Sequence, residues 1–190
     1  MHDGLGASLV FALRMIEAGQ LTLDEAADVL RECLDDLRLV IDSLEPFEHD
    51  LVTLLATLRY RLGSRLERAG IAIEWSMGSI PALTWMNAPQ ALEVLRIVQE
   101  ALTNVLKHAN ASRVRVSLGL DSAANEPGGE TVCLEIEDNG VGFTEVSPGG
   151  RGLGNMRHRA QLIGATLAID SGSGAVLRLL LPVRAKHGPK

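Results

Sequence analysis

Residues 87–112 read NAPQALEVLRIVQEALTNVLKHANAS, and this stretch decides how the surrounding chain must fold. Pro89 suits the first turn of a helix, where its missing N–H leaves no hydrogen bond unmade. At about 100° per residue along a helix, the apolar side chains gather on one side. They are Leu95, Val98, Leu102, Val105 and Leu106. The stretch therefore predicts a long amphipathic helix packed against a core.

The opposite side of this predicted helix carries a polar wedge about 100° wide. Its members are Glu100, Asn104, Lys107 and His108. A solvated polar face is the ordinary interpretation of such a wedge. A carboxylate, an amide oxygen and an ammonium at i, i+4 and i+7 can also bind a hydrated Mg²⁺ and a phosphate chain, because Mg²⁺ takes few protein ligands.

Short alternating segments surround this helix. Apolar residues alternate over residues 71–75, 114–118 and 132–136, and two further strands are predicted at 167–169 and 176–181. Another helix is predicted from about residue 50 to residue 69. Period-two segments interleaved with helical ones indicate an α+β fold, with a mixed sheet of about five strands and helices on one face. Residues 121–130 are predicted to form a polar hairpin loop.

Residues 4 to about 44 predict two helices joined by a short turn. The second helix has apolar residues at alternating spacings of three and four, which make a heptad seam. They are Leu23, Ala26, Leu30, Cys33, Leu37, Val40 and Leu44. A lone hairpin cannot bury two such stripes, whereas two hairpins can in a four-helix bundle. This region therefore predicts a homodimer, and packing of the stripe on the rest of the same chain is the alternative.

Two segments carry glycines beside predicted elements. In EIEDNGVGF, residues 135–143, Asp138 ends a strand and Gly140 and Gly142 follow. A carboxylate there can accept from an exocyclic amine, although a sharp turn would use the same residues. In SPGGRGLGNMRHRAQLIGA, residues 147–165, glycines precede a helix with Met156, Ala160, Leu162 and Ile163 on its apolar side. A helix N-terminus of this kind suits phosphates, although a flexible surface loop has the same composition.

Composition narrows the classes of protein that fit. The 190 residues are 46% hydrophobic and carry a formal net charge of −6, which gives no basic surface for nucleic acid. No apolar run reaches the roughly 18 to 20 residues of a membrane helix, and no signal peptide is visible. We expect a cytoplasmic chain without a membrane segment, and a membrane anchor elsewhere in a longer protein stays open.

In this order, the polar helix and the two glycine segments resemble the nucleotide-binding boxes of the GHKL ATPase/kinase superfamily. EALTNVLKHA resembles the N box, EDNGVGF the first glycine box and GRGLGNMRHRA the second. The closer resemblance is to sensor histidine kinases of the NarL/LuxR-associated type. It extends to MHDGLGASL at residues 1–9, which resembles their phosphotransfer helix. The resemblance implies a Bergerat-type α/β sandwich that binds ATP.

The resemblance also implies a role for individual residues. ATP would lie between the helix of Asn104 and a lid of residues 144–153, with Asp138 bonded to the adenine amine. Asn104 would ligate Mg²⁺, and Glu100 would hold a metal-bound water or orient the site. The remaining cofactor-binding residues would approach the phosphates or give the backbone access to the nucleotide. They are Lys107, His108, Gly140, Gly142, Gly152, Leu153 and Gly154.

The implied reaction is autophosphorylation. The γ-phosphoryl group of ATP would pass to a nitrogen of His2, and Asp3 would accept a hydrogen bond from the other nitrogen and so fix the tautomer. The phosphoryl group would then move to an aspartate of a response regulator of the NarL/LuxR type. Two alternatives remain: a nucleotide-binding dimerisation module that has lost catalysis, and a GHKL serine kinase or ATPase that needs no histidine.

The sequence departs from the family pattern at two positions. Ala7 replaces a glutamine that is linked, in the family, to positioning water for dephosphorylation of the regulator, so we expect weak phosphatase activity. Ala175 replaces a frequent threonine, which weakens one contact to adenine. We expect residues 1–46 to form the dimerisation and phosphotransfer hairpin, residues 47–185 the ATP-binding domain and residues 186–190 a tail. Because family members have further helix before the histidine, we also expect a fragment or a truncated gene product.

Overall fold

The structure is a computed structural model that describes Val10, residues 13–16, Ala18, Leu34, and residues 51–121, 130–142 and 151–184. The chain divides into two compact units, Met1–Phe47 and Glu48–Lys190. In the first unit Val10, residues 13–16 and Leu34 are helical. The rest of the predicted hairpin, including its heptad seam, lies outside the described residues.

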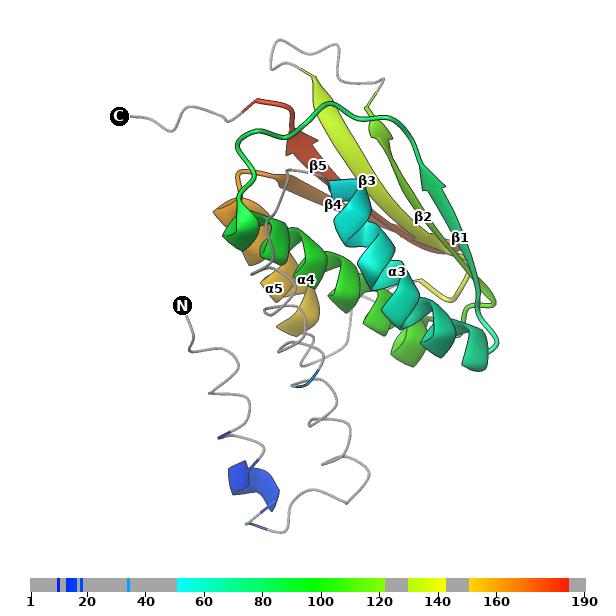
Figure 1. The fold of residues 1–190 in the computed structure, drawn as a ribbon. Helices are drawn as coiled ribbons and strands as arrows, with labels where there is room; N and C mark the ends of the chain where they lie inside the picture. Colours follow the sequence, from blue (N-terminus) through cyan, green and yellow to red (C-terminus); the bar gives the residue numbers. More distant parts are fainter. Residues whose placement is uncertain are drawn as a thin grey trace. The chain divides into compact units, whose positions relative to one another are not determined.

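The second unit is a five-stranded mixed sheet with helices on one face (Figure 1). Its elements are α3 (Leu51–Arg68), β1 (Ala72–Met77), α4 (Ala88–Asn104), η1 (Val105–Ala109), β2 (Arg113–Leu120), β3 (Thr131–Asp138), α5 (Arg151–Leu162), β4 (Thr166–Gly172) and β5 (Gly174–Pro182). The strand order is β1-β2-β3-β5-β4. Strands β1 and β2 are parallel, and the other neighbours are antiparallel. The predicted fold class is confirmed for this unit.

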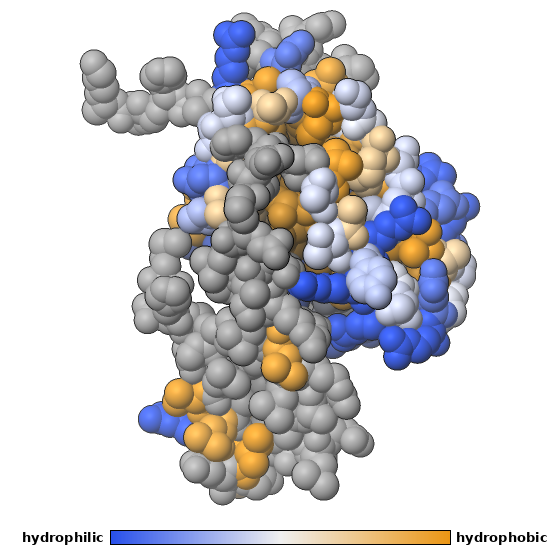
Figure 2. Space-filling view, in the orientation of Figure 1, coloured by the Kyte–Doolittle hydropathy of each residue, from blue (hydrophilic) through white to orange (hydrophobic). Residues whose placement is uncertain are grey.

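The core lies between the sheet and the three helices. Alternating residues of β2 and β3 are buried, among them Val114, Val116, Val132 and Leu134. Helix α4 contributes Val94, Ile97 and Val98, all without exposed surface. Alternation on the strands and helical spacing on α4 place these side chains on facing surfaces, as the sequence predicts. Figure 2 shows hydrophilic residues mainly along the right and lower edges of this unit, with hydrophobic residues nearer its centre.

Helix α4 begins at a capping box. The side chain of Asn87 accepts the N–H of Gln90 at 3.2 Å, and the side chain of Gln90 accepts the N–H of Asn87 at 2.9 Å. This reciprocal pair satisfies two donors that would otherwise be left open at the helix start. Pro89 lies in the first turn, as the sequence predicts.

Three local expectations are wrong. The helix of residues 87–112 is not α-helical to its end, because residues 105–109 form the π-helical turn η1. Gly152 and Gly154 do not precede α5 but lie in its first turns, since α5 already begins at Arg151. Leu162 is 61% exposed rather than packed, because it is the last residue of α5, where the chain turns toward β4. Among the described residues, no helix is both long and apolar enough to span a bilayer.

Two tryptophans allow a test of how the ends of this sheet are held. The indole N–H of Trp85 donates to the carbonyl oxygen of Pro182 at 2.7 Å, which ties the connection before α4 to the end of β5. The indole N–H of Trp75 on β1 is buried and finds no acceptor among the described residues. Removing a satisfied buried donor leaves its acceptor unpaired, whereas removing an unsatisfied donor relieves a cost.

We therefore predict opposite outcomes for the same substitution at the two positions. Trp85→Phe should lower the free energy of unfolding by about 1–2 kcal/mol, and Trp75→Phe should leave it unchanged or raise it. Urea denaturation followed by circular dichroism measures both variants. Equal destabilisation by the two substitutions would contradict this assignment of the hydrogen bond.

Candidate nucleotide-binding site

The predicted polar wedge lies at the C-terminal half of α4 and in η1. Glu100 and Asn104 are half-buried on α4, and Lys107 and His108 are exposed in η1. The spacing of 100° per residue fails beyond Asn104, because a π-helical turn contains more residues than an α-helical turn. Turns of this kind occur frequently at functional sites. The four side chains therefore share one end of the helix but not one regular stripe.

The left-handed residue Asn110 ends this turn, with φ of 49° and ψ of 36°. Asparagine tolerates this conformation better than most residues do. The chain then enters β2 at Arg113. This ending directs the carbonyl oxygen of Ala109 at the loop that follows β3, where it accepts the N–H of Val141.

Asp138 is the one buried charged or polar residue in the described core, with 7% of its surface exposed. It ends β3, and its Oδ1 accepts the N–H of Gly140 at 2.8 Å. This bond forms a tight turn within the motif that the sequence singles out. The carboxylate accepts one bond there and has capacity for more. Asp138 can therefore form this turn and still accept a hydrogen bond from a ligand.

Asn139 has a structural role that the sequence does not reveal. Its Oδ1 accepts the N–H groups of Ser112 and Arg113 at 3.0 and 2.9 Å, and its Nδ2 donates to Ser112 Oγ at 2.9 Å. These bonds fasten the end of β3 to the start of β2. An asparagine at a strand end is the only signal in the sequence, and it does not say which backbone groups are bound.

Gly140 joins the first glycine segment to η1. The N–H of Val141 donates to the carbonyl oxygen of Ala109 at 2.8 Å. A Cβ atom on Gly140 would lie 2.1 Å from that same oxygen, so no larger residue fits without backbone movement. Gly142 has φ of 72°, a left-handed conformation that favours glycine, and lies against Ser171 on β4. The segment is held between η1 and the β4–β5 hairpin.

Gly152 joins the second glycine segment to α4. A Cβ atom on Gly152 would lie 2.2 Å from Oε1 of Glu100, so the absence of a side chain lets the first turn of α5 approach the carboxylate. Leu153 is half-buried beside it, and Gly154 is exposed with open space around its Cα. Helix α4 and η1 therefore contact both glycine segments, the second through Glu100 and the first through Ala109. Ala175, which replaces the frequent threonine, is 6% exposed on β5.

His2, Asp3, Ala7 and residues 144–150 of the predicted lid lie outside the described residues, whereas residues 151–153 of that lid form the first turn of α5. Their predicted roles stay predictions. The structure brings Gly140 to Ala109 at the end of η1 and Gly152 to Glu100, although these residues are far apart in the sequence.

The donor atoms of this cluster fit a nucleotide with Mg²⁺. Glu100 and Asn104 offer oxygen atoms one helical turn apart, and hard oxygen donors are what Mg²⁺ prefers. A dedicated cage is not required, since Mg²⁺ keeps several waters and binds phosphate oxygens. In the described parts of the chain no three His, Cys, Asp or Glu side chains converge as a transition-metal site would require.

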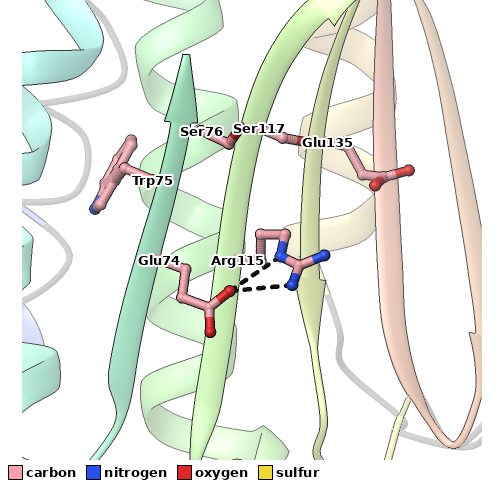
Figure 3. A pocket seen from close by; sticks show the side chains of 6 residues that line it. All are labelled: Glu74, Trp75, Ser76, Arg115, Ser117 and Glu135. Carbon is pink, nitrogen blue, oxygen red and sulfur yellow. Dashed lines mark hydrogen bonds and ion pairs between the residues drawn. The ribbon is translucent and has the colours of Figure 1, made fainter. Parts of the chain in front are cut away.

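The outer face of the sheet has a separate cavity of about 400 Å³ (Figure 3). It is lined by Glu74, Trp75, Ser76, Arg115, Ser117 and Glu135. Its charged groups are already paired, because Arg115 contacts Glu74 at 3.1 Å through both Nε and Nη2. Beside it, burial raises the pKa of the Cys133 thiol, and the Glu135 carboxylate raises it further, so this cysteine is a poor nucleophile at neutral pH. None of the predicted site residues lines this cavity.

Comparison with known proteins identifies the family. Residues 90–185 match the family described as histidine kinase-, DNA gyrase B-, and HSP90-like ATPase. The chain belongs to this ATPase family. The matched range begins in α4 and extends past β5, so it contains every described residue of the cluster.

Relatives of this ATPase domain are sensor kinases. The chain is 31% identical over 198 residues to the oxygen sensor histidine kinase NreB of Staphylococcus carnosus, covering 96% of the chain and 54% of NreB. It is 31% identical over 168 residues to the nitrate/nitrite sensor protein NarQ of Escherichia coli, covering 87% of the chain and 27% of NarQ. The chain thus spans about half of NreB, and it carries the ATP-binding domain of the histidine kinase type.

Solved structures show the same fold. The histidine kinase domain of the blue-light activated kinase of Erythrobacter litoralis EL346 matches with a TM-score of 0.63 at 19% identity, over 94% of this chain and 83% of that one. Full-length ShkA in complex with AMPPNP matches with a TM-score of 0.54 at 19% identity, over 94% of this chain and 42% of that one. The α/β sandwich is therefore the one found in histidine kinases.

The close approach of α5 to Glu100 generates a prediction. In Gly152→Ala the new methyl group should displace the Glu100 carboxylate, which sits at the flexible end of its side chain, without breaking the fold. We expect binding of Mg-ATP to weaken by roughly fivefold, while stability changes by no more than about 1 kcal/mol in either direction, as helix propensity allows. Titration calorimetry and thermal unfolding measure the two quantities.

Gly63→Ala is the matched control. Gly63 lies in α3, and a Cβ atom there meets nothing within 4 Å. This variant should bind Mg-ATP as the original chain does. If Gly152→Ala also binds unchanged, the contact with Glu100 has no part in nucleotide binding.

Proposed function

We propose that this chain is the core of a sensor histidine kinase, which autophosphorylates His2 with ATP and passes the phosphoryl group to a response-regulator aspartate. One observation carries the proposal: the end of α4 contacts both glycine segments. Gly152 lies against Glu100 and Val141 donates to Ala109, so three separate motifs line one region. The family match supports ATP as the nucleotide.

The adenine end of the nucleotide is assigned to Asp138. Its buried carboxylate is an acceptor only, and the exocyclic amine of adenine is a donor, so the two are complementary. Guanine has a carbonyl oxygen at the equivalent position, which a carboxylate would repel. Gly140 and Gly142 allow the backbone to lie against the base. The turn bond from Gly140 holds Asp138 in place before the base arrives, which lowers the cost of binding.

The phosphate end is assigned to α4, η1 and α5. Asn104 supplies the protein oxygen that ligates Mg²⁺, and Glu100 lies one turn earlier, where it can hold a metal-bound water. The Mg²⁺ ion neutralises charge on the phosphate oxygens when it is bound. Lys107 and His108 are exposed and reach the phosphates from η1. Gly152 and Leu153 lie in the first turn of α5, whose N–H groups have no acceptor within the helix, and Gly154 follows directly; the helix dipole there favours anions.

In the proposed transfer step, one bond to phosphorus forms and another breaks. A ring nitrogen of His2 forms a bond to the γ-phosphorus, the bond from that phosphorus to its bridging oxygen breaks, and ADP leaves. Asp3 accepts a hydrogen bond from the other ring nitrogen and stabilises the cationic phospho-imidazole that forms. Such reactions depend on positioning and charge neutralisation, which the cluster supplies.

The partners we propose are a second copy of this chain and a response regulator of the NarL/LuxR type. Val10, Leu13, Ile16 and Leu34 are each at least 42% exposed, and apolar helical surface of this kind suits a partner helix. Curated relatives bear names such as nitrate/nitrite sensor and kinase/phosphatase, which are those of signalling proteins. We assign residues 1–46 to dimerisation and phosphotransfer, residues 47–185 to ATP binding and residues 186–190 to a tail. The cytoplasm supplies ATP and is the proposed compartment.

The experiment is autophosphorylation with γ-labelled Mg-ATP. We predict acid-labile, base-stable label on the chain, as a phosphohistidine gives. His2→Gln should abolish the label and leave nucleotide binding unchanged. Asn104→Ala should lower the label by at least roughly a hundredfold, the scale for loss of a group that positions charge in phosphoryl transfer.

Glu135→Gln serves as the control, because Glu135 lies on the outer sheet face and pairs with Arg178. It should keep its label. Label that survives His2→Gln would overturn the phosphoacceptor assignment. Binding of ATP without any label would favour the alternative of a dimerisation module that has lost catalysis.

A further inference from the structure

Helices α4 and α5 approach each other closely at two places. Glu93 on α4 meets Arg159 on α5, and Glu100 on α4 lies against Gly152 on α5. On each helix the two positions are seven residues apart (100 − 93 and 159 − 152). Seven residues make about two turns, or about 10.5 Å, and return to the same face. The two contacts therefore lie two turns apart along one face of an antiparallel pair of helices.

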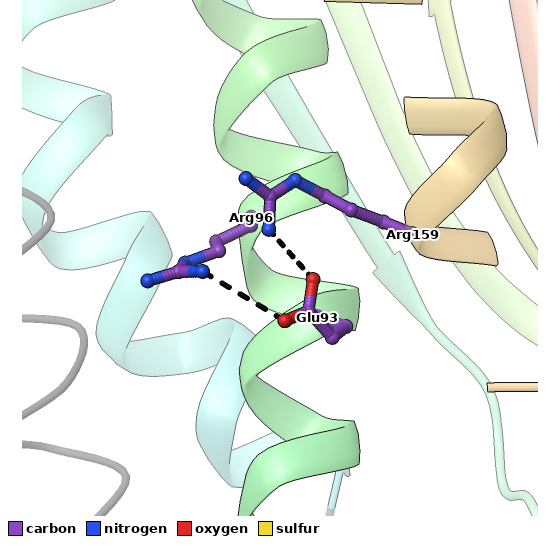
Figure 4. Close-up of polar contacts among 3 residues, drawn as sticks. All are labelled: Glu93, Arg96 and Arg159. Atoms are coloured by element: carbon purple, nitrogen blue, oxygen red, sulfur yellow. Dashed lines mark hydrogen bonds and ion pairs between the residues drawn. The ribbon is translucent and has the colours of Figure 1, made fainter. Parts of the chain in front are cut away.

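The contact at Glu93 is a short ion pair with Arg159. Arg159 Nη1 lies 2.6 Å from Glu93 Oε2, and the side chains are 30% and 15% exposed. Arg96 Nη1 lies 3.7 Å from the other oxygen, Oε1. Figure 4 shows Arg159 reaching across from α5 while Arg96 approaches the same carboxylate from its other side. Partial burial reduces screening of such a pair by salt.

Arg96 makes the carboxylate harder to replace. Its Nε is buried and has no hydrogen-bond partner among the described residues. Glu93 thus compensates two guanidinium groups, one on its own helix and one on α5. Loss of the Glu93 charge would leave both cations partly desolvated without an anion, which costs more than loss of an exposed pair.

We propose that Glu93 and Arg159 are positioning residues for the nucleotide site, an inference that rests on the proposed function. The pair fixes α5 against α4 two turns away from the site. That register places the first turn of α5, with Gly152, beside Glu100 at the proposed phosphate site. Neither residue contacts the nucleotide, and both act by fixing the position of α5.

The apolar contacts of α5 explain why the fold does not need the pair. Met156 and Ala160 are buried at 0% and 1% exposure, so they hold α5 on the core. Apolar packing is not directional and tolerates a small slide or rotation of the helix. The short hydrogen bond from Arg159 Nη1 to Glu93 Oε2 is directional and does not tolerate it. The ion pair therefore fixes the register of α5, which apolar contacts already hold on the core.

The test is a double-mutant cycle with Glu93→Gln, Arg159→Gln and the combined variant. We expect each single variant to raise the Kd for Mg-ATP by roughly fivefold, and the combined variant to be no weaker than the worse single one, since contacting residues couple. Arg159→Lys keeps the charge but changes the geometry of the donor group, so it should retain part of the affinity that Arg159→Gln loses. Binding is measured by calorimetry, with thermal unfolding recorded on every variant.

Glu135→Gln is the matched control. The Glu135–Arg178 pair on the outer sheet face has the same 2.6 Å contact, yet touches neither α4 nor α5. Because this pair is more exposed than Glu93–Arg159, Glu135→Gln should lower stability by no more than Glu93→Gln does, and it should leave the Kd unchanged. Hydrogen exchange without nucleotide gives a second readout: residues 151–155 should exchange faster in Glu93→Gln and unchanged in Glu135→Gln.

The outcomes separate the two proposals. If exchange in residues 151–155 is the same in Glu93→Gln and Glu135→Gln, the positioning role is wrong, whatever the nucleotide does. If Glu93→Gln weakens Mg-ATP binding no more than Glu135→Gln does, the role is equally wrong. If the original chain does not bind Mg-ATP, the proposed function fails instead, and the exchange result still decides the register of α5.

Discussion

The hydrogen bond from Val141 N–H to the carbonyl oxygen of Ala109 is the contact on which the site depends. It requires the π-helical turn η1 to present that carbonyl and Gly140 to come close without a Cβ. Through it, the end of β3 and its buried Asp138 are held beside the polar end of α4. The β4–β5 hairpin then packs against Gly142 from the other side. This backbone contact thus links η1 to the loop that follows β3.

The rest of the second unit supports this contact. The capping box at Asn87 fixes where α4 begins, and the buried residues of α4 fix which face it presents. Asn139 fastens β3 to β2 directly before the loop. Since each support is made by a different segment, the three motifs can be far apart in sequence and still meet. Family membership agrees with this arrangement, because the matched range contains all three.

Much of the fold could be predicted from local pattern. Val114, Val116 and Leu118 alternate and are buried, and the helix at 51–68 was expected within one residue at each end. The order of the motifs, together with the family resemblance, predicted that Asp138 and the glycines share one site; the structure shows Gly140 beside Asp138 and Ala109, and Gly152 beside Glu100. Local pattern could not predict the π-helical turn at Val105, because it depends on how the chain must enter β2. It also could not predict the exposure of Leu162 or the register of α5, since Glu93 and Arg159 are distant in sequence and meet only in the folded chain.

The central claim is that an adenine nucleotide binds where α4, the loop after β3 and the start of α5 meet. Backbone amide NMR with and without Mg-ATP tests it most directly. We predict shifts at residues 100–109, 138–142 and 151–156, with residues 74–77 and 133–135 on the outer sheet face unmoved. Shifts gathered around Glu74, Arg115 and Glu135 instead, or no shifts at saturating nucleotide, would contradict it.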